Sequence, residues 1–392
     1  MPRSPRAHAT VPLCALAVAI VLFAAERAAQ AYPQWQLSTG AARCNQCHYA
    51  PAGGGLLTSF GRDAVGDQLS TFGGDGAFLH GAVTLPTWLA VTADLRYAFV
   101  DQDVQDPNGN TVASFPMQAD ATVRVAPGAG FSATGIIGFR GQIRNPGLLV
   151  PPESYQPVDT SQLISREHFI TWQPESVGPY LRVGRFYAPF GLRMAEHVLY
   201  IRRDLGFDWL HETYNLSGGW VYPRWELHLT VFGPDFIRHI GSDESGFAAY
   251  GEGRFLDDHL ALGAQARVAV DPGVARAMVG AVAKYYLEPL RTMFLGEVDF
   301  VQLLFDTPGI ASRGQVVGAA GVAVLPIPSV IVTLLGERSQ VDLTVNDAWT
   351  AATGLLNWFP YAHCELQVMG RLQFPTGGDV AKTLFIQGHY YF

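Results

Sequence analysis

The sequence feature that most constrains the fold is an alternation of apolar and polar residues with a period of two. Along residues 89–99 the odd positions are apolar, and Thr92, Asp94 and Arg96 lie between them. The same alternation returns along residues 223–231 and 363–374. A strand with this pattern has lipid on one face and a wet lumen on the other, because charged side chains are costly in lipid.

The pattern predicts an all-β protein, a transmembrane antiparallel β-barrel of about 14–16 strands formed by residues 85–392. A charged fraction of 15% is low against the roughly 25% of soluble domains, which also indicates lipid as the solvent of one face. The chain ends on an alternation that closes at Phe392, which resembles the C-terminal signal of bacterial outer-membrane proteins. We therefore expect the bacterial outer membrane as location. A soluble β-sandwich is the alternative, but it would have no reason to end on an exposed Phe.

The N-terminus has the pattern of a secretory signal peptide over residues 1–31. Arg3 and Arg6 precede an apolar stretch, and Ala29-Gln30-Ala31 has the small-x-small form of a cleavage site. No later apolar run reaches the roughly 18 residues of a helical span. With 26 basic and 34 acidic residues and no basic cluster, the charge distribution gives a nucleic-acid partner no support.

A Cys-x-x-Cys-His motif lies shortly after the signal. In such a motif two thiols form thioethers with a haem and the histidine becomes an axial ligand of the iron. The motif therefore predicts one covalent haem c, with Cys44 and Cys47 as the linkages and His48 as the proximal ligand. A zinc site would need a second close pair of ligands, and a redox dithiol would need a βαβ unit. A structural disulfide remains open.

Residues 32–84 would form a monohaem cytochrome c-like head. Gly53–Gly55 would let the backbone pass close to a flat cofactor, and Leu56, Leu57 and Phe60 would cover a porphyrin face. Some fifty residues are too few for a complete cytochrome core, so we expect the head to lean on the barrel interior.

The second iron ligand has several candidates. His80 is the other histidine of the head, and it could fold back over the cofactor to join His48 as a metal ligand. Met194 and His197 are alternatives further along the chain. A methionine would raise the reduction potential and a second histidine would lower it.

The chain resembles the outer-membrane fused monohaem cytochrome–porins, which are known as iron oxidases of iron-oxidising bacteria. The resemblance covers the order of signal, head and barrel, and its sharpest match is Cys44–His48 followed by the run from Leu57 to Arg62. Thr58 stands where that family usually has Asn, and Gly53–Gly55 replace its Pro-x-Leu approach. Residues 184–193 also look like the strand and inward loop of phosphate-selective-type porins.

The resemblance implies electron transfer across the outer membrane. Its partners would be an extracellular electron donor or acceptor, with Fe(II) as the candidate donor, and a periplasmic electron carrier. Surface carboxylates could dock cations near the mouth, among them Asp101, Asp103, Asp106, Asp243 and Glu244.

Two other classes of function stay open. One is a porin for small solutes or anions with a structural disulfide and an eyelet lined by Arg140, Arg182, Arg185, Arg202 and Arg203. The other is a haem enzyme of the peroxidase type, with an open sixth position at the iron.

Overall fold

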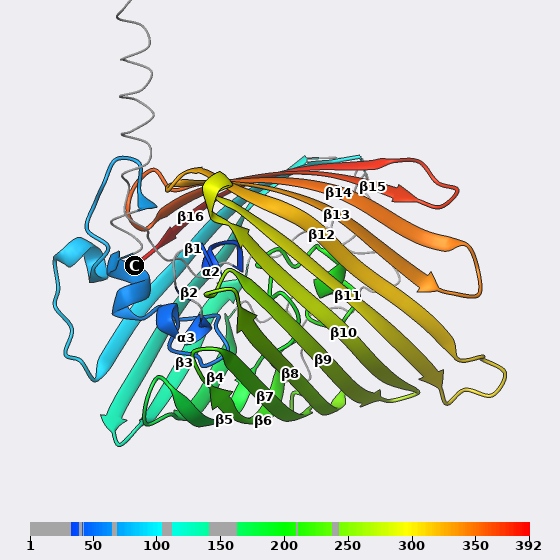
Figure 1. The fold of residues 1–392 in the computed structure, drawn as a ribbon, viewed down its shortest axis with the longest axis horizontal. Helices are drawn as coiled ribbons and strands as arrows, with labels where there is room; N and C mark the ends of the chain where they lie inside the picture. The colour runs from blue at the N-terminus through cyan, green and yellow to red at the C-terminus, as the bar shows by residue number, and fades with distance from the viewer. Residues whose placement is uncertain are drawn as a thin grey trace, which may run out of the picture.

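The structure is a computed structural model that describes residues 33–38, 41, 43–64, 69–103, 112–140, 163–208, 211–236 and 243–392. Within these residues sixteen antiparallel strands form a closed barrel, in which each strand pairs with the next along the chain and β1 pairs with β16 (Figure 1). The expected all-β barrel of 14–16 strands is confirmed. The predicted signal peptide, residues 1–31, lies outside the described residues.

The strands have the following bounds: β1 (Leu89–Gln102), β2 (Val112–Gly128), β3 (Phe131–Arg140), β4 (Leu163–Trp172), β5 (Gly178–Phe186), β6 (Thr213–Val221), β7 (Trp225–Gly233), β8 (Ser245–Phe255), β9 (Leu260–Asp271), β10 (Val274–Leu287), β11 (Thr292–Phe305), β12 (Arg313–Ile327), β13 (Val330–Asp342), β14 (Asp347–Trp358), β15 (Cys364–Pro375) and β16 (Ala381–Tyr391). Among the helices of the described residues, none is long and apolar enough to cross a bilayer.

The alternation in the sequence corresponds to the two faces of the barrel wall. Leu95 and Tyr97 of β1 and Val231 of β7 are exposed on the outside, whereas Glu226 and His228 of β7 are buried inside. Exposed apolar side chains recur around the outer surface on nearly every strand. A wall of this kind suits a lipid solvent.

The two ends of the barrel differ in the length of their connections. The connections β2–β3, β6–β7 and β12–β13 are short turns, and the end of β16 lies beside the start of β1 at the same end. The opposite end carries longer connections, including the one between β5 and β6. Outer-membrane barrels have short periplasmic turns and long outer loops, so we call these ends periplasmic and extracellular.

The N-terminal segment enters the lumen and then follows the periplasmic rim. Its elements are α2 (Pro33–Gln36), α3 (Cys44–Cys47), η1 (Phe60–Ala64) and η2 (Phe78–Gly81). The α2 residue Gln36 reaches Glu252 of β8 and Lys284 of β10. Further along, the backbone of Thr71 and Phe72 donates to carbonyls of the β14–β15 turn. These contacts show that the segment packs against the barrel interior, as expected from the sequence.

A second segment, the connection between β5 and β6, also folds into the lumen. We call residues 187–208 the inward loop; it contains the helix α5 (Tyr200–Arg203). The backbone nitrogens of Leu192 and Tyr200 each donate at 2.7 Å to wall carboxylates, those of Glu297 and Glu337. Since α5 also contacts β11, β12 and β13, the inward loop is fastened across the lumen.

The inside of the barrel contains an apolar core. It combines Leu37, Ala41, Cys47 and Leu69 of the head with inward-loop residues such as Leu199 and with wall residues of β9–β15. On β10–β14, apolar side chains such as Met278 and Ile331 face this core. Protein segments take the place of water there, because apolar side chains gain free energy by packing away from water.

Candidate functional site

The Cys-x-x-Cys-His motif forms a single turn of helix inside the barrel. Cys44 and Cys47 begin and end α3, and residues three apart on a helix lie on the same face. The helix ends at His48, whose backbone is extended and whose N–H donates to the Cys44 carbonyl at 3.0 Å. The chain then reverses, because His48 pairs with Leu57 as an isolated antiparallel bridge. The structure thus brings Cys44, Cys47, His48 and Leu57 together.

A glycine loop passes close to the first cysteine. Gly53, Gly54 and Gly55 have φ angles of +84°, +83° and +62°, a region that side chains disfavour. A Cβ atom on Gly53 would lie 3.0 Å from Cys44 Cβ and 3.7 Å from His48 Cδ2. Only glycine therefore allows this close approach. The loop leaves a surface without side chains beside Cys44 and His48.

The two motif cysteines are free thiols, as is Cys364, so the structure does not contain the disulfide of the alternative interpretation. Cys47 is only 3% exposed. Burial, together with the charge of Cys44, raises the pKa of the Cys47 thiol to about 12. Burial also raises the pKa of the Cys44 thiol, although the nearby Arg193 opposes this shift.

These residues fit a c-type haem. Two free thiols share one face of a helical turn, the histidine follows directly, and the glycine loop provides an approach that a side chain would fill. Leu57 is half-buried and Phe60 is 45% exposed, so both have surface left for a further partner. Leu56 is buried instead and packs within the protein.

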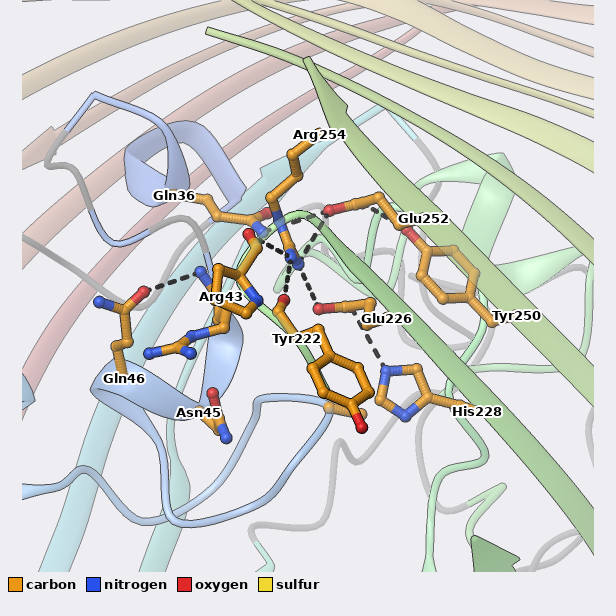
Figure 2. Close-up of polar contacts among 12 residues, drawn as sticks. Gln36, Arg43, Asn45, Gln46, Tyr222, Glu226, His228, Tyr250, Glu252 and Arg254 are labelled. Carbon is orange, nitrogen blue, oxygen red and sulfur yellow. Dashed lines mark hydrogen bonds and ion pairs between the residues drawn. The ribbon is translucent and has the colours of Figure 1, made fainter. Parts of the chain in front are cut away.

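A buried charge cluster on β7, β8 and β10 faces the head (Figure 2). Arg254 pairs with Glu226 and, at 3.4 Å, with Glu252. Lys284 lies 2.5 Å from Glu252 and donates to the Gln36 side chain at 2.6 Å. Buried charges are stable only when paired in this way, so the cluster also fixes the position of α2.

Two further side chains complete this cluster. His228 Nε2 lies 3.3 Å from Glu226, and the Tyr250 hydroxyl donates to Glu252 at 2.7 Å. The sequence analysis missed the cluster as a unit. Its signal was present in the alternating charges of Glu226 and His228 and of Glu252 and Arg254, but only the barrel register places these strands side by side.

The structure places His80 at the periplasmic rim. Its Nε2 atom lies 3.0 Å from the Tyr390 hydroxyl, and its ring centroid lies 4.6 Å from that of His363. These partners belong to the β15–β16 side of the rim, whereas His48 packs against Gly53 and Leu57. The structure therefore does not bring His80 to the motif, and its role as an iron ligand stays a prediction.

Three of the charged residues considered for the porin eyelet or for the extracellular mouth have ion-pair partners, whereas Asp106 lies outside the described residues. Arg182 lies 3.6 Å from Glu167, and Arg185 lies 3.5 Å from Asp235. Glu244 is buried and pairs with two arginines of the wall, which leaves it poorly placed to dock a cation. Among the described residues, no group of three or more His, Cys, Asp or Glu side chains could hold a metal ion.

Comparison with known proteins identifies the barrel. The structure is similar to OmpT expressed in the outer membrane of Vibrio cholerae, with a TM-score of 0.59 and 10% identity over 79% of this chain and 100% of that one. It is also similar to the anion-selective porin from Comamonas acidovorans, with a TM-score of 0.58 and 9% identity over 78% of this chain and 99% of that one.

A third similar structure is the outer-membrane channel DcaP of Acinetobacter baumannii, with a TM-score of 0.53 and 10% identity over 78% of this chain and 97% of that one. No family model and no curated protein matches the sequence. At these identities the similarity shows a shared fold. The described residues form a sixteen-stranded barrel of the outer-membrane porin type, and the predicted location in the bacterial outer membrane is confirmed.

Proposed function

We propose that the chain is an outer-membrane c-type cytochrome–porin that carries electrons across the outer membrane through one haem attached to Cys44 and Cys47. The observation that carries the proposal is the position of the motif, on a helical turn inside the lumen and against a side-chain-free glycine loop. The proposal includes the signal peptide at residues 1–31 and the haem-binding head at residues 32–84. Such a haem would supply a site that takes up and releases one electron at a time.

The residues of the chain would have distinct parts in this function. Cys44 and Cys47 would hold the cofactor, and His48 would be its proximal ligand. Leu57 and Phe60 would cover its apolar surface, while the apolar core around Cys47 keeps water away. Since Cys47 is almost fully buried in the barrel, a haem would be attached to it before the barrel closes.

The donor in this proposal is Fe(II) on the extracellular side. Each Fe(II) would lose one electron and become Fe(III), and a periplasmic electron carrier would accept that electron. The head and the inward loop meet inside the lumen and pack against its wall, which supports transfer of electrons rather than passage of the ion.

The test of the proposal is a haem stain after denaturing electrophoresis. The mature protein, made in a host with haem-attachment machinery, should carry one covalent haem. The stain should disappear in Cys44→Ala and Cys47→Ala, and the control Cys364→Ala should keep it. An unstained wild-type band would overturn the proposal. A redox spectrum then distinguishes a six-coordinate electron-transfer site from the five-coordinate site of a peroxidase-type enzyme.

A second candidate function, a channel for small solutes or anions, is favoured by the fold itself. The comparisons support this candidate more directly than electron transfer, since the similar structures include an anion-selective porin. Conductance in planar bilayers separates the two. Under our proposal the full chain conducts poorly and a variant lacking residues 33–84 conducts more. Equal, porin-like conductance of both proteins would favour the channel.

A further inference from the structure

Arg193 of the inward loop joins three parts of the molecule. Its guanidinium donates to the carbonyl oxygen of Ala52, next to the glycine loop of the head. The same group lies 3.6 Å from Glu226 of β7, and its Cζ atom lies 4.7 Å from the centre of the Tyr250 ring on β8. One side chain from the extracellular connection therefore contacts both the head and the buried charge cluster of β7 and β8.

The backbone at Arg193 is held in an unfavourable conformation. Its φ of +56° lies in the left-handed region, which residues other than glycine rarely adopt. The two residues before it are fixed by the wall, because Gly191 donates to Gln265 at 2.6 Å and Leu192 donates to Glu297 at 2.7 Å. A strained residue that its surroundings hold in place often serves a functional site.

The residues that Arg193 contacts lead directly to the haem-attachment motif. Ala52 precedes Gly53, and Gly53 packs against Cys44 and His48. The other charged groups around Cys44 include Glu226, Glu252, Arg254 and Lys284, all on wall strands. Arg193 is thus the charge that the extracellular loop contributes to this neighbourhood.

We propose that Arg193 is the positioning residue through which the inward loop fixes the haem-attachment loop and raises the reduction potential of a haem held by Cys44 and Cys47. This inference rests on the proposed function. The reduced site carries one positive charge fewer than the oxidised site, so a nearby cation in a poorly hydrated place favours reduction. The extracellular loop, in addition to the axial ligands, then determines which donors can reduce the protein.

The experiment compares three variants by redox titration of the purified, haem-loaded protein. Arg193→Gln removes the charge, and we expect a lower reduction potential. Arg193→Lys keeps the charge but loses the planar fork that reaches Ala52 and Glu226 together, so we expect a smaller decrease. The control is Arg203→Gln, because Arg203 pairs with the neighbouring Asp204 within the inward loop itself. It should keep the wild-type potential.

The outcomes distinguish this inference from the proposed function. Wild-type protein without haem would overturn the proposed function. A haem-loaded R193Q protein with the wild-type potential would overturn the role of Arg193 alone. If R193Q does not assemble into a heat-modifiable barrel, an assembled R193K protein decides, and a wild-type potential in that variant also overturns the inference.

Discussion

The strands β5–β8 line the lumen mainly with charged and polar side chains, whereas β10–β14 line it mainly with apolar ones. On the first side, which we call the charged wall, Glu226, Glu252 and Arg254 are buried and paired. On the second side, the apolar wall, the inner faces present residues such as Met278 and Ile331. Both walls face the same lumen, but they hold the inserted segments by different forces.

The difference explains how two segments with little structure of their own keep fixed positions. The charged wall holds the head through the hydrogen bond from Gln36 to Glu252, and it holds the inward loop through the ion pair of Arg193 with Glu226. The apolar wall binds α5 of the inward loop mainly by burial of apolar surface, to which the hydrogen bond from the Tyr200 backbone to Glu337 adds one directed contact. A porin with an open channel needs water along its wall, and an apolar wall covered by protein excludes that water.

The largest effect should come from breaking the charged wall. Arg254→Met leaves Glu226 and Glu252 without their shared guanidinium, and removing one partner of a buried ion pair costs about 3–5 kcal/mol. Denaturant unfolding in lipid vesicles, followed by tryptophan fluorescence, measures this loss. Arg338→Met is the control, because Arg338 is exposed and its guanidinium donates to the side chains of Thr350 and Gln340. Equal stability of the two variants would contradict a structural role for the charged wall.

A cavity at the apolar wall should have the next largest effect. Leu199 is fully buried in the lumen core, so Leu199→Ala should lower the free energy of unfolding by about 2–5 kcal/mol. Leu334→Ala removes the same atoms from an exposed position on the outer face and should cost much less. The same unfolding measurement compares them. A loss in Leu199→Ala no larger than in Leu334→Ala would mean that the inward loop does not pack on this wall.

The smallest effect should come from the contact between the head and the charged wall. Gln36→Ala removes hydrogen bonds to Glu252 and Lys284, and bonds to charged groups contribute about 1.5–3 kcal/mol. Gln46→Ala is the matched control, because the Gln46 side chain accepts a hydrogen bond from the Arg43 backbone inside the head. Protease resistance of the head in folded barrels measures the local loss. An equally resistant Gln36→Ala protein would show that other contacts hold the head.

Several properties could be predicted from the sequence because they depend on neighbours along the chain. The period of two in residues 89–99 and 223–231 identified strands and the face that each turns to lipid, since successive side chains of a strand point to opposite sides. The spacing of Cys44, Cys47 and His48 likewise identified a candidate attachment motif, which the fold carries on one helical turn.

Only the tertiary structure determined which residues these local features contact. Arg193 lies 141 residues from Ala52 in sequence, and Lys284 lies 248 residues from Gln36, so no local pattern could join them. His80 was a plausible iron ligand by distance along the chain, but its contacts with Tyr390 and His363 place it at the rim. The sequence determined which face of each strand turns to lipid and which to the lumen, because apolar and polar side chains alternate along the strand. The contents of the lumen depend on closure of the sheet, because only closure brings wall strands, head and inward loop within contact distance.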